Sequence, residues 1–290
     1  MKILEPYIFF IFILLLIQIQ SFSIEFSTLR LFKKVNIFRI FKNCINDLTI
    51  NFNRCLIKNH FSYKLEQVFV SLLLIIALPV LIYFCLFSFE KYRIHFELIL
   101  TSYLVLLSLF FIFIENINIT KNVYRVLFMF CVFYMSYKTL FFFEDKEYLN
   151  DFYVSSNQTW GNIYTHAGLT LASYLSLLEI NNYILKHKTN NQLIKNLMLV
   201  TGTVIFITFS MNGGNDYILF FLLEHTKDNL YYECLLLVFL LKFFIVVLFS
   251  DHLHMGYFKI IQKYDLAIFK TEVILVLSIA LSVIYGNFYV

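Results

Sequence analysis

Long apolar stretches without a charged side chain constrain this chain more than any other feature. Residues 69–87, for example, contain no Asp, Glu, Lys, Arg or His. Each such stretch is close to the roughly 20 residues that a helix needs to cross the hydrocarbon of a bilayer. Only helices and closed barrels satisfy their backbone in lipid, and these stretches lack the alternation of barrel strands. The sequence therefore predicts transmembrane α-helices.

The share of charged residues excludes a soluble protein. Only 14% of the residues are charged and 60% are hydrophobic, whereas about a quarter of a soluble domain is charged. We expect an all-α membrane protein, a polytopic helical bundle of about eight transmembrane helices. The expected spans are residues 7–24, 67–89, 97–115, 123–143, 162–185, 197–222, 230–255 and 270–288. The sixth is interrupted by Asn212-Gly213-Gly214-Asn215-Asp216, so it is expected to kink there or end early.

Charges between the spans indicate which segments share a membrane face. Segments 25–66, 115–122, 186–196 and 256–269 hold an excess of Lys and Arg, and the remaining segments hold an excess of Asp and Glu. This is the bias that the positive-inside rule describes. Eight spans preserve the bias, with both termini on the acidic side, whereas an odd number would scramble it.

The segment 25–66 mixes basic residues with Leu, Phe and Ile. Such a mixture is typical of amphipathic helices at a membrane interface, where the cations meet anionic phospholipids. Phospholipids are therefore expected partners of this segment. Nothing else in the chain indicates binding of nucleic acid.

Ionisable residues within membrane spans are costly and often functional. The candidates are Arg125, Lys138, Glu179, Asp216, Glu233, Lys242, Asp251, His252 and Glu272. Arg125, Lys138, Asp251 and Glu272 lie near span ends, where a long side chain can reach water. Lys242 lies about midway along its span, so it faces either a partner subunit or an internal polar cavity. A structural ion pair and a proton-relay role both remain open for it.

One group of polar residues follows the seventh span. His252, Gly256, Lys259 and Lys263 have the spacing that places residues on one helix face. A His with Gly one turn later leaves room for a flat macrocycle, and cations further along suit its propionates. Because imidazole is a standard axial ligand, this pattern indicates a haem b half-site with His252 as the iron ligand. The alternative is an interfacial His with lysines that face lipid headgroups.

These residues carry a resemblance to a known family. Residues 231–286 resemble the membrane anchors, or cytochrome b subunits, of succinate dehydrogenase and fumarate reductase (respiratory complex II). In the larger anchor of that family a helix carries His-x3-Gly, and His252-x3-Gly256 corresponds to it. The larger anchor's motif continues with Arg-His and then Asp. Here Phe258-Lys259 replaces Arg-His, and Lys263 replaces the Asp. Lys263-Tyr264 takes the place of the smaller anchor's Asp-Tyr, whose Tyr binds the quinone.

The preceding helix departs from the same family at its quinone-binding positions. Val200-Thr201-Gly202 matches the end of the larger anchor's motif Ser-x2-His-Arg-x-Ser/Thr-Gly. Lys195 takes the place of its Ser, Met198 of its His and Leu199 of its Arg. The resemblance therefore lacks the quinone-binding residues of this motif.

The resemblance implies three regions and a set of partners. Residues 1–66 would form a transmembrane helix with a basic interfacial segment, 67–190 a helical membrane extension, and 191–290 a three-helix anchor-like region. The family implies haem b, ubiquinone, an iron–sulfur subunit and a second anchor. The chain itself would be a non-catalytic subunit that tethers soluble catalytic subunits, since it carries no dinucleotide-binding or cluster-binding motif.

The family also implies the mitochondrial inner membrane. An abundance of Phe, Ile, Asn and Lys is typical of AT-rich genomes, organellar ones among them, and the first residues are not an Arg-rich presequence. Two other functions remain open: a supernumerary structural subunit of a respiratory complex without a cofactor, and a divergent core membrane subunit of complex I or cytochrome oxidase. An unrelated transporter is a weaker alternative, because transporters usually have broken helices in two related halves.

Overall fold

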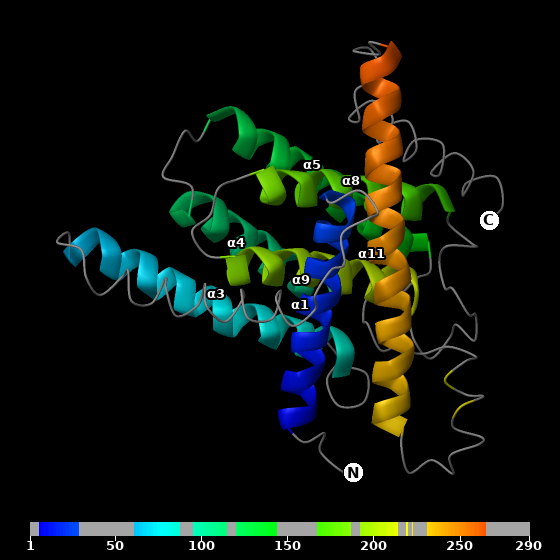
Figure 1. Ribbon diagram of the computed structural model, residues 1–290, viewed down its shortest axis with the longest axis horizontal. Helices are drawn as coiled ribbons and strands as arrows, with labels where there is room; N and C mark the ends of the chain where they lie inside the picture. Colours follow the sequence, from blue (N-terminus) through cyan, green and yellow to red (C-terminus); the bar gives the residue numbers. More distant parts are fainter. Residues whose placement is uncertain are drawn as a thin grey trace.

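The structure, a computed structural model, is α-helical over nearly all of the residues that it describes (Figure 1). The described residues are 6–28, 61–87, 95–114, 120–143, 167–186, 192–213, 219, 222 and 231–264. Their seven long helices are α1 (Pro6–Thr28), α3 (Phe61–Phe87), α4 (Phe96–Ile114), α5 (Thr120–Phe143), α8 (Ala167–Lys186), α9 (Gln192–Ser210) and α11 (Tyr231–Tyr264). The predicted all-α class is confirmed for these residues. The expected span at 270–288, and most of the segment 25–66, lie outside them.

Three of these helices are long and apolar enough to cross a membrane. The qualifying segments are Val68–Leu86 in α3, Leu193–Ser210 in α9 and Tyr231–Phe249 in α11. Shorter apolar segments occupy α1, α4 and α5. The described helices thus support association with a membrane, whereas a total of eight spans stays a prediction.

Helix α9 ends earlier than the predicted span 197–222, at Ser210. Asn212 and Gly213 follow with φ angles of 55° and 56°, in the left-handed region where a helix cannot continue. The amides of Met211 and Gly213 both donate to the carbonyl of Ile207, at 2.9 and 3.1 Å. These bonds close the last turn in the way a left-handed residue commonly ends a helix.

Helix α11 continues past the predicted end of its span at residue 255. It has 34 residues, which corresponds to about 51 Å at the rise of an α-helix. A bilayer's hydrocarbon core is only about 30 Å thick. The helix is therefore long enough to cross a bilayer at a steep tilt or to extend beyond it.

The helices form two sets that cross (Figure 1). Helices α1 and α11 run side by side, and α3, α4, α5, α8 and α9 run across them. Because one membrane normal cannot be parallel to both sets, at least one set must be tilted in a bilayer. Helix α9 lies at the centre, where it packs against α1, α3, α4, α8 and α11.

Candidate functional site

Lys242 lies in α11, midway along the predicted span 230–255, and is buried, with 1% of its surface exposed. Its Nζ donates to the carbonyl of Met211 at 2.7 Å and to that of Gly213 at 2.9 Å. Both acceptors belong to the turn that ends α9. Of the two alternatives for Lys242, a partner subunit and an internal polar cavity, both stay open as predictions; the contacts described here are to backbone carbonyls within the chain.

The position of this ammonium group is favourable for two reasons. The last carbonyls of a helix have no partner within the helix, and the helix dipole adds partial negative charge at that end. A lysine from a neighbouring helix supplies both the missing donors and the opposite charge. Lys242 thus caps α9 from α11, which offsets part of the cost of burying a charge.

A second set of contacts joins the same end of α9 to α5. The hydroxyls of Tyr137 and Ser210 lie 2.9 Å apart, and both residues are buried. The Tyr137 ring is also in edge contact with Phe133 and Phe209, at centroid distances of 4.9 and 5.0 Å. The end of α9 is thereby held from two directions, by an ammonium group and by a phenol.

The other end of α9 has a comparable arrangement. Lys195 donates from its Nζ to the carbonyl of Leu185 at 2.6 Å, one residue before α8 ends at Lys186. Beside it, Asn196 donates to the hydroxyl of Ser21 in α1 at 2.8 Å. No local sequence pattern indicates this contact of Lys195, because the lysine lies in the predicted loop 186–196.

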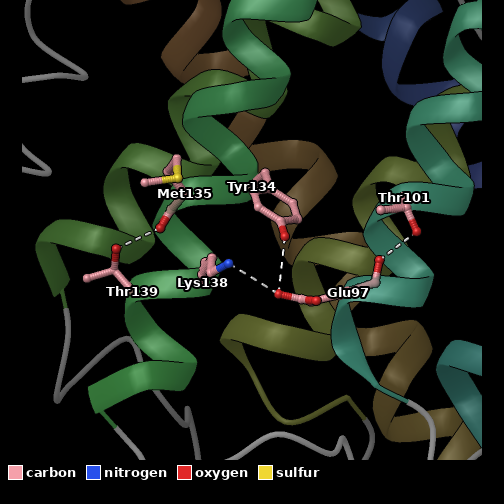
Figure 2. Close-up of polar contacts among 6 residues, drawn as sticks. All are labelled: Glu97, Thr101, Tyr134, Met135, Lys138 and Thr139. Atoms are coloured by element: carbon pink, nitrogen blue, oxygen red, sulfur yellow. Dashed lines mark hydrogen bonds and ion pairs between the residues drawn. The ribbon is translucent and has the colours of Figure 1, made fainter.

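A polar cluster at the surface joins α4 to α5 (Figure 2). Lys138 and Glu97 form an ion pair of 3.5 Å, and Tyr134 donates to the same carboxylate oxygen, Oε1, at 3.2 Å. The Lys138 ammonium also lies 5.9 Å from the centre of the Tyr134 ring. Lys138, expected only to reach water from a span end, is therefore part of a contact between helices.

The residues predicted to form a haem and quinone site lie in the last turns of α11. The helix is continuous through His252, Gly256, Lys259, Lys263 and Tyr264. The predicted spacing on one helix face is therefore retained along the backbone. The positions of these side chains lie outside what the structure describes, so ligation by His252 stays a prediction.

The motif at Val200-Thr201-Gly202 has a packing role in this structure. A Cβ atom on Gly202 would lie 2.6 Å from Tyr103 Oη and 2.8 Å from Leu177 Cδ1. Glycine at this position leaves room for these two side-chain ends from α4 and α8, which would have to shift to admit a Cβ atom. Met198 and Leu199, which replace the family's His and Arg, are fully buried in the same core.

Among the other candidates, Glu179 is buried within α8 and Glu233 is exposed on α11. The side chains of Arg125, Asp216, Asp251 and Glu272 lie outside the described part. Within that part, no three His, Cys, Asp or Glu residues gather closely enough to hold a metal ion. The buried contacts described above fasten helices to one another.

The chain was compared with known proteins in three ways. No protein-family model, no curated protein and no solved structure matches it. The resemblance of residues 231–286 to the anchors of succinate dehydrogenase therefore rests on the short motifs alone.

Proposed function

We propose that this chain is a non-catalytic membrane subunit of a respiratory quinone oxidoreductase, most like the anchor of succinate dehydrogenase in the mitochondrial inner membrane. The observation that carries the proposal is the continuity of α11 through Tyr264. A break after the apolar segment, which ends at Phe249, would have separated His252 from the residues that follow it. The unbroken helix keeps the pattern in register.

This register is compatible with a haem b half-site. Successive α-helical residues are 100° apart, so His252 and Gly256 are about 40° apart around the axis, and Lys259 and Lys263 are nearby. His252 would be the axial ligand, Gly256 would leave space beside it, and the two lysines would pair with propionates. Bound haem would supply one-electron transfer. A second His would come from another anchor subunit.

The proposed quinone contact is Tyr264, with an iron–sulfur subunit adjacent on the basic side of the membrane. A phenol at the end of a helix can donate a hydrogen bond to a quinone carbonyl. A Tyr264→Phe variant is expected to lower ubiquinone reduction by the assembly about tenfold, the effect of losing one such bond. Unchanged activity would remove Tyr264 from the site.

A second candidate is a structural subunit without a cofactor, and Lys242 favours it over a proton-pumping core subunit. A proton relay needs a group that can change its partners during turnover. Lys242 instead donates to two carbonyls that end α9. Its loss would therefore loosen the contact between helices.

The test is a difference spectrum of the purified native assembly, reduced minus oxidised, with every subunit identified. His252→Leu should abolish a b-type absorbance while all subunits are retained. His254→Leu is the matched control, because residue 254 lies about 200° away around the helix. Absence of haem from the unmodified assembly would leave the structural subunit as the better account. Partners without an iron–sulfur subunit would refute the complex II assignment.

A further inference from the structure

The cluster of Glu97, Tyr134 and Lys138 has properties that a contact between helices does not require. Glu97 lies in the first turn of α4 and Lys138 lies near the end of α5. Their side chains remain 47% and 54% exposed. The ion pair is therefore accessible from outside the protein, at one end of two neighbouring apolar helices.

The pair also retains unused hydrogen-bonding capacity. Tyr134 and Lys138 both contact Oε1 of Glu97, so Oε2 has no partner among the described residues. An ammonium group carries three donors, and within the described part Lys138 uses its charge on this one carboxylate. The cluster thus presents a free carboxylate oxygen and free N–H donors next to each other.

Two exposed and mainly apolar stripes begin within about one turn of this pair. One follows α4 and the other follows α5, each towards the middle of its helix. The stripes consist of Leu98, Thr101 and Val105 on α4, and of Phe128, Cys131 and Met135 on α5. Thr101 and Met135 lie on opposite sides of the ion pair (Figure 2). Because Glu97 begins α4 and Lys138 is near the end of α5, both stripes run in the same direction from the charges.

We propose that this cluster is a binding site for one phospholipid with a zwitterionic headgroup that bears a primary amine, the phosphatidylethanolamine class. The phosphate accepts hydrogen bonds from Lys138, and the amine donates to Oε2 of Glu97. Such charge-assisted bonds are the strong ones. The acyl chains follow the two stripes, and Tyr134 holds the carboxylate in place.

The net charge and the N–H donors of the headgroup distinguish this lipid from phosphatidylglycerol and phosphatidylcholine. A phosphatidylglycerol lacks the amine, and its net negative charge is repelled by Glu97. A phosphatidylcholine carries a positive charge but has no N–H to donate. The site differs from the predicted basic segment 25–66, where charge would favour anionic lipids. It requires a membrane location and does not depend on the proposed haem or quinone.

The test is lipid binding to the delipidated full-length protein in detergent, measured by native mass spectrometry. Phosphatidylethanolamine, phosphatidylcholine and phosphatidylglycerol with identical acyl chains are compared. The expected preference for phosphatidylethanolamine is about tenfold, as one charge-assisted hydrogen bond would give. Glu97→Gln should abolish this preference, because it removes the negative acceptor for the amine. Lys138→Met should instead weaken the binding of all three lipids, because all three carry the phosphate. Thr139→Val is the matched control, since it removes a hydroxyl next to Lys138 outside the proposed site without removing a charge, and it should leave the preference unchanged.

Three outcomes would overturn the proposal. These are equal binding of the three lipids by the unmodified protein, a preference for phosphatidylglycerol, and an unchanged preference in the Glu97→Gln variant. The comparison of lipids on the unmodified protein needs no variant, so misfolding cannot obscure it. Exposed ion pairs contribute only about 0–1 kcal/mol to stability, so both variants are expected to fold. Absence of haem would not affect this experiment, because native mass spectrometry measures only the binding of lipid.

Discussion

Helix α9 is more buried than α3, yet its apolar segment is less hydrophobic. In α9, 94% of the apolar segment is buried within the protein, and its mean hydropathy is 1.7. In α3, only 33% of the apolar segment is buried, and its mean hydropathy is 2.8. The more buried helix is thus the less apolar one. A soluble protein shows the reverse, because its core is more apolar than its surface.

The difference follows from the solvent. Lipid tails are as apolar as leucine, so an outward face such as that of α3 gains nothing from polar groups. The interior can use small residues for close approach and polar residues for bonds between helices. Helix α9 does both, with Gly202 against Tyr103 and with Ser210 and Asn196 bonded to other helices.

Among substitutions that compare the two helices, Lys242→Met should cause the largest loss of stability, because it acts at the end of the buried helix α9. The change keeps most of the side-chain volume but leaves the carbonyls of Met211 and Gly213 without their donor. Each buried acceptor left unsatisfied costs about 1–3 kcal/mol, so the loss of the donor to both carbonyls should lower the free energy of unfolding by about 2–6 kcal/mol. It can be measured by denaturant titration in mixed micelles, followed by circular dichroism. Leu241→Met, at an exposed neighbour on the same helix, should have almost no effect; equal losses would show that the cap contributes nothing.

Gly202→Ala should have the next largest effect, about 1–3 kcal/mol, as is typical of overpacking. The added methyl group would lie 2.6 Å from Tyr103 Oη. Tyr103→Phe removes this oxygen, which has no hydrogen-bond partner among the described residues. The double variant should therefore recover part of the loss in the same titration. An additive result would contradict the close approach of α4 to α9.

Tyr137→Phe tests the phenol at the end of α9, with an expected cost of about 1 kcal/mol for one hydrogen bond. Ser210→Ala should cost a similar amount, because the two hydroxyls are 2.9 Å apart. In a double-mutant cycle the two effects should be less than additive. Full additivity would mean that the bond is not formed.

The smallest effect is expected on the outward face of α3. Ile76 and Val80 are 65% and 47% exposed, so in a membrane they contact lipid. Ile76→Ala and Val80→Ala should each change the free energy of unfolding by less than about 0.5 kcal/mol, as surface substitutions do. A cost similar to that of Gly202→Ala would place α3 against protein and would remove the contrast with α9.

Hydropathy was sufficient to predict where the outer helices lie. Helices α1, α3, α4 and α5 begin and end within two turns of the expected spans, since their apolar runs set their limits. It was insufficient for α11, because Lys and Gln favour a helix as Leu does and the helix continues through Lys259 and Lys263. The end of α9 depends on two left-handed residues, Asn212 and Gly213, within the interruption that the sequence showed.

The candidate site was predictable only in part. The midspan position of Lys242 predicted a buried lysine, and its burial is confirmed. Its acceptors lie 29 and 31 residues away in the chain, in the turn that ends α9. No local sequence pattern reveals such a pair. Lys195 and Tyr137 were missed for the same reason. The roles of His252 and Tyr264 stay predictions.

Labelling of the native membranes with a lipid-soluble photoreactive probe can show whether α3 faces lipid and whether α9 is shielded from it. The modified residues are read by peptide mass spectrometry, so no substitution is needed. We expect labelling on the exposed face of α3, at Phe69, Ile76 and Val80. No labelling is expected along α9 from Leu193 to Ser210, because this segment is buried. Labelling of α9 at the level of α3, or no labelling of either helix, would contradict this expected difference between the two helices.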